Sequence, residues 1–270
     1  MENKEVADLV KEKLELKNPK IAVILGSGLG DLAESLENPK RLSYKDIPGY
    51  PTSSVEGHKG ELVNGTLYGK EVLCMNGRVH LYEGYSPNMV AHAIYLLKDL
   101  GIKQLIVTNA AGSLTADIAP GSLMLISDHI NFSGRNPLVG PNNDFYGPRF
   151  PAMNGAYTPR LREKMKQIAS KNNIEVCEGV YLMVLGPNFE TAAEVRMFAK
   201  LGADAVGSST VPEVIVASQC SMEVLGISVI TNYGAGMMQN TPSHLETLQN
   251  ANKAADKLVK LVTEFIKEEG

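Results

Sequence analysis

The chain has 270 residues, 44% of them apolar, and its 26 Lys and Arg against 30 Asp and Glu give a formal net charge of −4 at pH 7. An acidic balance with no basic block argues against a nucleic-acid partner, because phosphate contacts need clustered Lys and Arg. The charged N-terminal segment lacks the apolar core of a secretory signal, and no apolar run reaches the ~18–20 residues that span a bilayer. We therefore expect no membrane partner.

Cys74, Cys177 and Cys220 lie far apart in the sequence and form no CxxC pair. An odd number of scattered cysteines fits reduced thiols better than a disulfide framework or a zinc site. The composition therefore predicts a cytoplasmic globular protein.

Short apolar runs alternate with helical patterns along the chain, which is typical of an α/β sheet. Capping signals, such as Ser86-Pro87 at a start and Gly101 at an end, mark helix boundaries. The predicted helices cover 2–17, 87–100, a segment from 159, 190–201, a segment from 212, and the C-terminal segment after a capping box at 243–246. The predicted strands cover 20–25, 61–68, 71–75, 104–109, 122–127, 176–185, 203–206 and 224–231.

Residues 131–156 interrupt this alternation with prolines, glycines and almost no periodicity. So long a segment without helix or strand is usually a lid, a binding loop or an interface arm. No repeat, linker or low-complexity tract divides the chain, so we predict a single domain over 1–270.

Polar or glycine-rich sequences follow five of the predicted strands. Ligands of open α/β sheets bind outside the carboxyl ends of the strands, which meet at one edge. These sequences are GSGLG at 26–30, NGRVH at 76–80, NAAG at 109–112, GSST at 207–210 and TNYGAG at 231–236. Their common position predicts a ligand site there.

The glycine-rich turn at 26–30 fails the dinucleotide fingerprint, because Asp31 stands where GxGxxG needs its third glycine. A Rossmann oxidoreductase is thereby disfavoured. The turn offers free N–H groups and the Ser27 hydroxyl, which is a plausible nest for a small anion. A simple glycine turn is the alternative.

Arg78, His80 and Tyr82 alternate with apolar residues in the densest polar cluster of the chain. In an extended segment the three side chains would point the same way, and a guanidinium beside an imidazole suits a phosphate oxyanion. An exposed edge strand is the alternative. His58, between glycine and lysine, is a weaker candidate, because a lone histidine beside glycines is more often a loop residue than a ligand.

Phe189 and Glu190 place an aromatic ring beside a carboxylate, a pair that can stack on and accept hydrogen bonds from a flat heterocycle. Glu190 can also be a first-turn acid that interacts with a helix dipole. Asn232 ends a buried strand, where its amide both donates and accepts. His244 begins the last helix and fits a solvent-facing neighbour of the capping box equally well.

Six blocks together resemble the trimeric purine nucleoside phosphorylases: GSGLG at 26–30, GRVHLYEGY at 77–85, TNAAG at 108–112, GPNFET at 186–191, STVPEVIVA at 209–217 and ITN at 230–232. The resemblance runs in order through nearly the whole chain. It implies a single α/β domain with a mixed sheet flanked by helices, which works as a homotrimer. It also implies reversible phosphorolysis of purine (2′-deoxy)ribonucleosides to the free base and (2-deoxy)ribose-1-phosphate, in purine salvage.

The resemblance assigns roles to individual residues. The phosphate site corresponds to Ser27, His58, Arg78, His80, the backbone at Ala110, and Ser209. The nucleoside site corresponds to Tyr82, Tyr181, Phe189, Glu190, Ser208, Asn232 and His244, with Phe150 closing the pocket of a neighbouring subunit. His80, Glu190 and Asn232 are the expected catalytic residues. No metal or organic cofactor is expected, and inorganic phosphate is a co-substrate.

The chemistry of these residues agrees with the resemblance. Cleavage of an N-glycosidic bond builds positive charge on the sugar, which a fixed phosphate dianion stabilises before it attacks. Glu190 suits the N1–H of a 6-oxopurine, and Asn232 suits N7. Methylthioadenosine phosphorylases, the nearest alternative, carry Asp at the position of Asn232 and an apolar residue near that of His244, so inosine and guanosine are the expected substrates.

The chain departs from the family where Gly-Met-Ser is replaced by Gly207-Ser208-Ser209. Ser208 keeps the backbone N–H that faces the ribose but loses the apolar packing under the sugar, so an altered sugar preference is expected. Two other functions stay open. A nucleosidase would leave the anion site unexplained, and a catalytically inactive binding protein would hold nucleoside without turnover.

Overall fold

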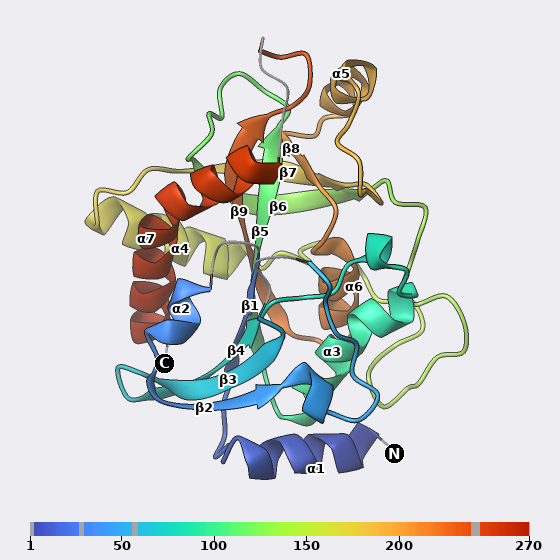
Figure 1. The fold of residues 1–270 in the computed structure, drawn as a ribbon, viewed down its shortest axis with the longest axis vertical. Helices are drawn as coiled ribbons and strands as arrows, with labels where there is room; N and C mark the ends of the chain where they lie inside the picture. The colour runs from blue at the N-terminus through green and yellow to red at the C-terminus, as the bar shows by residue number, and fades with distance from the viewer. Residues whose placement is uncertain (1–2, 27–29, 56–58, 239–243, 270) are drawn as a thin grey trace.

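The computed structural model describes residues 3–26, 30–55, 59–238 and 244–269, without the side chains of 3, 244–249, 252 and 253. In this part of the chain, nine strands form one mixed sheet that helices cover on both faces (Figure 1). The elements are α1 (Asn3–Lys13), β1 (Ile21–Leu25), α2 (Asp31–Glu34), β2 (Glu37–Ser43), β3 (Glu61–Leu67), β4 (Lys70–Asn76), α3 (Pro87–Asp99), β5 (Gln104–Ser113), β6 (Leu123–Asn131), α4 (Pro159–Lys171), β7 (Val176–Met183), α5 (Ala192–Lys200), β8 (Ala205–Gly207), α6 (Val211–Gln219), β9 (Glu223–Tyr233) and α7 (His244–Glu269), with short 3-10 turns at Tyr44–Asp46 and Leu81–Glu83. The predicted α/β class with a mixed sheet is confirmed.

The strand order is β2-β3-β4-β1-β5-β8-β7-β6-β9, and β9 also pairs with β5. β1 runs parallel to β4 and β5, and β5 runs parallel to β9. Because β9 pairs with both β5 and β6, the strands β5, β8, β7, β6 and β9 close into a ring at one end of the sheet. This closure gathers several strand ends around one point.

The two faces of the sheet bury alternate residues of the same strands, as the two-residue period of a strand requires. In β1, Ala22 and Ile24 pack in one core with residues of α1, α3 and α6, whereas Val23 and Leu25 pack in the other with α2, α4 and α7. Figure 1 shows α2, α4 and α7 on one side of β1 and α3 and α6 on the other. The predicted core face of α7 is confirmed where its side chains are described, at Ala251, Ala255, Leu258, Val262 and Phe265.

Most predicted boundaries hold within two residues. Ser86 caps α3, because its hydroxyl accepts a hydrogen bond from the backbone N–H of Met89 at 3.2 Å. The strands β5 and β6 run further than predicted, since pairing with β9 and β7 continues past their apolar runs. β2 was not predicted because this edge strand pairs with β3 alone and is mostly exposed. The predicted capping box at 243–246 falls partly outside the described residues.

The segment between β6 and α4 contains no helix or strand, as predicted. It is held to the fold by the Tyr146 hydroxyl, which donates to Asp99 at 2.8 Å, and by the Gln219 amide, which donates to Asn142 at 2.9 Å. Phe150 on this segment is 87% exposed. No helix within the described ranges is long and apolar enough to cross a membrane.

Candidate functional site

A pocket of about 320 Å³ lies where the carboxyl ends of several strands meet. Residues that end or directly follow six strands line it: Gly26 after β1, Arg78 after β4, Ala110 to Gly112 in β5, Val184 after β7, Gly207 in β8, and Thr231 and Asn232 in β9. Gly26 is needed for this convergence, because a Cβ there would lie 3.0 Å from the Cα of Asn109 and 3.1 Å from the carbonyl oxygen of Thr108. The pocket is therefore where the predicted strand-end sequences meet.

Arg78 is fixed at one end of the pocket by groups behind it. Its Nη1 donates to the Thr210 hydroxyl at 3.0 Å, and its Nη2 donates to the carbonyl oxygen of Thr108. Nη1 also lies 3.3 Å from Oε1 of Glu213, and both side chains are 3% exposed. A buried cation needs such partners, because burial of an unpaired charge is costly. The guanidinium is thus held in one orientation before any ligand binds.

Thr210 connects Arg78 to Asn109 and Ser209, which line the same end of the pocket. Its Oγ1 also accepts from Nδ2 of Asn109 at 2.8 Å and lies 3.2 Å from the hydroxyl of Ser209. Its backbone has φ 76° and ψ −49°, and the N–H of Val211 donates to the carbonyl of Ser209 at 2.8 Å. These values describe a γ-turn of the strained type, which is rare for a β-branched residue and is typical of functional sites.

His80 lies beside Arg78 and is oriented by Glu83. Oε1 of Glu83 accepts from the backbone N–H of His80 at 2.8 Å and lies 3.1 Å from Nδ1 of its ring. Burial pushes the pKa of Glu83 up, but hydrogen bonds from His80 and Ser54 outweigh it and hold the pKa at about 2. Glu83 is therefore a carboxylate at neutral pH and fixes the position of the imidazole.

The ring of Tyr82 stacks on that of His80, with centroids 4.6 Å apart and planes 13° from parallel. Burial, together with the negative charge of Glu83, raises the pKa of Tyr82 to about 12. Its hydroxyl therefore keeps its proton at neutral pH and is available as a donor at the pocket wall.

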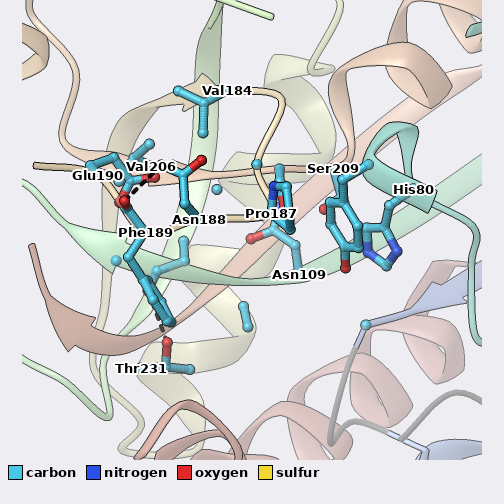
Figure 2. Close-up of a pocket in the computed structure, with 18 of the residues that line it drawn as sticks. His80, Asn109, Val184, Pro187, Asn188, Phe189, Glu190, Val206, Ser209 and Thr231 are labelled. Carbon is cyan, nitrogen blue, oxygen red and sulfur yellow. Dashed lines mark hydrogen bonds between the residues drawn. The ribbon is translucent and has the colours of Figure 1, made fainter. Parts of the chain in front are cut away.

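The opposite end of the pocket carries an aromatic ring, a carboxyl group and an amide. Figure 2 shows Phe189 and Glu190 at this end and His80 and Ser209 at the other. Burial and the nearby charge of Glu194 raise the pKa of Glu190 above its ordinary value. Asn232 is 4% exposed. Its Nδ2 donates to the carbonyl of Tyr233, and its Oδ1 accepts from the hydroxyl of Thr231, both at 3.0 Å.

The two ends suit two kinds of chemical group. A guanidinium, an imidazole, hydroxyls and the backbone of Ala110 can bind an oxyanion. A ring beside a carboxyl and an amide can bind a flat, polar heterocycle. Over the described ranges, no group of three or more His, Cys, Asp and Glu side chains is arranged to hold a metal ion.

Comparison with known proteins shows the family of the chain. Residues 20–267 match the phosphorylase superfamily. Purine nucleoside phosphorylase 1 of Bacillus subtilis is 50% identical over 260 residues, which cover 96% of each chain. The chain belongs to the purine nucleoside phosphorylases.

Solved structures of purine nucleoside phosphorylases share the fold. Isoform 2 of the enzyme from Schistosoma mansoni, in complex with cytosine and ribose-1-phosphate, superposes with a TM-score of 0.94 at 41% identity, covering 100% of this chain and 97% of that one. The Schistosoma mansoni enzyme in complex with inosine superposes with a TM-score of 0.93 at 38% identity, covering 99% and 96%. These matches extend over both ends of the pocket.

The structure brings most of the predicted site residues of this phosphorylase together. Those that line the pocket are Arg78, His80, Tyr82, Ala110, Phe189, Glu190, Ser208, Ser209 and Asn232. Ser27 and His58 lie outside the described residues, as does the side chain of His244, although its backbone begins α7. The roles of all these residues remain predictions.

Two predicted residues do not line the pocket of their own chain. Tyr181 was expected at the base and sugar, but it is fully buried behind Ser209, whose backbone N–H donates to its hydroxyl at 3.3 Å. The prediction for Tyr181 is corrected: its hydroxyl lies against Gly207 and Ser209, so the ring supports the pocket wall from behind. Phe150 projects from the segment between β6 and α4 and is 87% exposed.

Two local predictions are also corrected. Glu190 was placed inside a helix, but α5 begins at Ala192 with Thr191 as its cap, so Glu190 precedes the helix and does not belong to its first turn. Arg78, His80 and Tyr82 were placed on one extended segment, but residues 81–83 form a 3-10 turn. The turn, and not the alternation of a strand, brings Tyr82 against His80.

Sequence reasoning missed Glu83, Asn109, Thr210 and Glu213, which hold the predicted residues in place. Asn109 ends a predicted strand and begins the NAAG sequence that was expected at the ligand site, so its position was a usable signal. Thr210 and Glu213 stand in the STVPEVIVA block, but apolar neighbours gave no indication of their burial beside Arg78. Glu83 lies in the polar cluster at 77–85 and could have been paired with His80 by its spacing.

Proposed function

We propose that the chain cleaves 6-oxopurine nucleosides, inosine and guanosine, by reversible phosphorolysis to the free base and ribose-1-phosphate, with the 2′-deoxynucleosides as further substrates. The observation that carries this proposal is that one pocket combines an anion-binding end at Arg78 and His80 with a base-binding end at Phe189 and Glu190. Relatives that bind inosine or ribose-1-phosphate support it.

At the anion-binding end, phosphate is held by Arg78, His80, Ser209 and the backbone of Ala110, with Ser27 and His58 as further expected contacts. The fixed dianion faces the sugar and stabilises the positive charge that develops as the glycosidic bond breaks. A phosphate oxygen then forms the new bond to the sugar carbon from which the base has left. Positioning and electrostatics supply most of the rate enhancement.

At the other end, Glu190 accepts a hydrogen bond from the N1–H of the purine while Phe189 lies against the base. Asn232 donates to N7, where negative charge develops as the base departs. Tyr82 and His244 are expected at the ribose. This donor and acceptor pattern matches a 6-oxopurine, whereas adenine has no proton on N1 to offer to a carboxylate.

We infer also that the enzyme is a cytoplasmic homotrimer. An exposed aromatic side chain on a long segment, Phe150, supports this, because such a ring gains by burial against a neighbouring subunit. Sedimentation of the purified chain tests the assembly, and a fully active monomer would contradict it.

Steady-state kinetics with inosine, guanosine and adenosine at saturating phosphate test the substrate assignment. We expect kcat/KM for inosine and guanosine to exceed that for adenosine by at least about 10²-fold, since a missing hydrogen-bond partner leaves a buried polar group unpaired. Equal values for inosine and adenosine would contradict the assignment, and a preference for adenosine would favour the methylthioadenosine phosphorylase alternative.

A further inference from the structure

Arg78 forms a wall between the pocket and a second, small cavity. The second cavity, of about 10 Å³, lies behind the guanidinium and is lined by residues that include Arg78, Tyr50 and Glu213. Arg78 lines both cavities, whereas Glu213 lines only the second one. Glu213 can therefore influence a ligand in the pocket only through Arg78 or through its electric field.

Two neutral acceptors and one carboxylate contact the guanidinium of Arg78. The orientation is fixed by hydrogen bonds to the Thr210 hydroxyl and to the Thr108 carbonyl. Glu213 approaches to 3.3 Å as an ion pair, in an environment where both side chains are 3% exposed. Thr210 and Thr108 offer no negative charge, so the buried cation is balanced by Glu213.

We propose that Glu213 is a positioning residue that balances the charge of Arg78 in the empty site and thereby limits the affinity for phosphate. The proposal rests on the assignment of Arg78 to the phosphate site. A phosphate dianion that binds to Arg78 shares the buried guanidinium with the carboxylate of Glu213, which carries a negative charge as phosphate does. Glu213 thus stabilises the protein without phosphate and weakens the binding of phosphate and of the phosphorylated sugar.

The variant Glu213→Gln tests this idea because it keeps the size of the side chain and an oxygen toward Arg78 but removes the charge. Titration calorimetry with inorganic phosphate alone should show a Kd lower by about tenfold, which corresponds to about 1.4 kcal/mol. The Tm without phosphate should fall, and the rise in Tm on adding phosphate should exceed that of the wild type. The KM for inosine should stay unchanged.

Tyr50→Phe is the matched control. The Tyr50 hydroxyl is buried in the same cavity and has no hydrogen-bond partner among the described residues, so its loss alters the cavity but not the charge on Arg78. We expect wild-type phosphate affinity for this variant. A merely structural role for Glu213 would lower the Tm of Glu213→Gln and leave its phosphate affinity equal to that of the control, which would overturn the proposal.

Glu213→Asp provides a second variant if the glutamine variant fails to fold. It keeps the charge but withdraws it from Arg78 by one methylene, so phosphate should bind more tightly than to the wild type by a smaller factor. Unchanged or weaker phosphate binding by Glu213→Asp would overturn the proposal. Wild-type protein that binds no phosphate in calorimetry would overturn both this proposal and the proposed function, whereas wild-type binding with no change in the variants overturns this proposal alone.

Discussion

Replacement of Thr210 by valine isolates the hydroxyl that connects the anion-binding end of the pocket. Valine has nearly the same shape, and its branched Cβ suffers the same strain at φ 76°. The substitution removes only the acceptor for Arg78 and Asn109 and the contact with Ser209. Any change in phosphate binding therefore reports on the hydrogen bonds and not on the backbone.

The magnitude follows from the two buried donors that lose their acceptor. A charged donor such as the guanidinium of Arg78 contributes about 1.5–3 kcal/mol, and the amide of Asn109 contributes about 1 kcal/mol. The free energy of unfolding should therefore fall by about 2.5–4 kcal/mol, which lowers Tm by about 5–15 °C at this chain length. Because Arg78 loses one of the bonds that orient it, the Kd for phosphate should rise by about tenfold or more.

Thermal unfolding and phosphate calorimetry measure both effects on one protein sample. Thr263→Val is the matched control, because the hydroxyl of Thr263 is buried without a partner among the described residues and its loss should change neither quantity. A Thr210→Val variant with wild-type Tm and wild-type phosphate affinity would refute the reasoning. The Kd for phosphate should rise in Thr210→Val but fall in Glu213→Gln. The two variants therefore separate the orientation of Arg78 from the compensation of its charge.

Three further predictions concern the nucleoside end of the pocket. Asn232→Asp should raise the adenosine-to-inosine ratio of kcat/KM by about tenfold, because a carboxylate accepts from the 6-amino group or from protonated N7; an unchanged ratio would contradict the role of Asn232. The pKa of Glu190 is raised, so its carboxyl gains a proton as the pH falls through that pKa, and the adenosine-to-inosine ratio of kcat/KM should then rise. Profiles of this ratio against pH check the prediction for the wild type. In Glu190→Gln the ratio should not vary with pH. Ser208→Met should restore apolar packing under the sugar and lower the KM for inosine by about threefold or more without altering the Kd for phosphate; a higher KM for inosine would show that the serine itself contacts the ribose.

Much of the fold could be predicted from the sequence because local signals and tertiary structure agree. The helix α3 begins at its predicted cap Ser86, and the hairpin of β3 and β4 turns at Gly69 as expected. The edge strand β2 escaped prediction because its exposed, charged residues carry no alternation. The closure of the sheet by β9 could not be predicted, since pairing between strands distant in the sequence leaves no local pattern.

The site was predictable as far as its side chains follow strands or stand in recognisable blocks. Arg78, Glu190 and Asn232 were found in this way, and the structure places them in one pocket. Residues that act behind the pocket, such as Glu213, carry no such mark, because a buried carboxylate in an apolar helix looks like a solvent-facing acid until its partner is seen. Tyr181 was misplaced because the sequence does not show whether its ring lies inside the pocket or behind the pocket wall.

Inosine cleavage by the purified protein, with and without inorganic phosphate, tests the central claim most directly when hypoxanthine and the sugar product are both quantified. The proposed function predicts that hypoxanthine and ribose-1-phosphate appear together, in equal amounts, and only when phosphate is present. Hypoxanthine with free ribose in the absence of phosphate would contradict it and would make the enzyme a hydrolase.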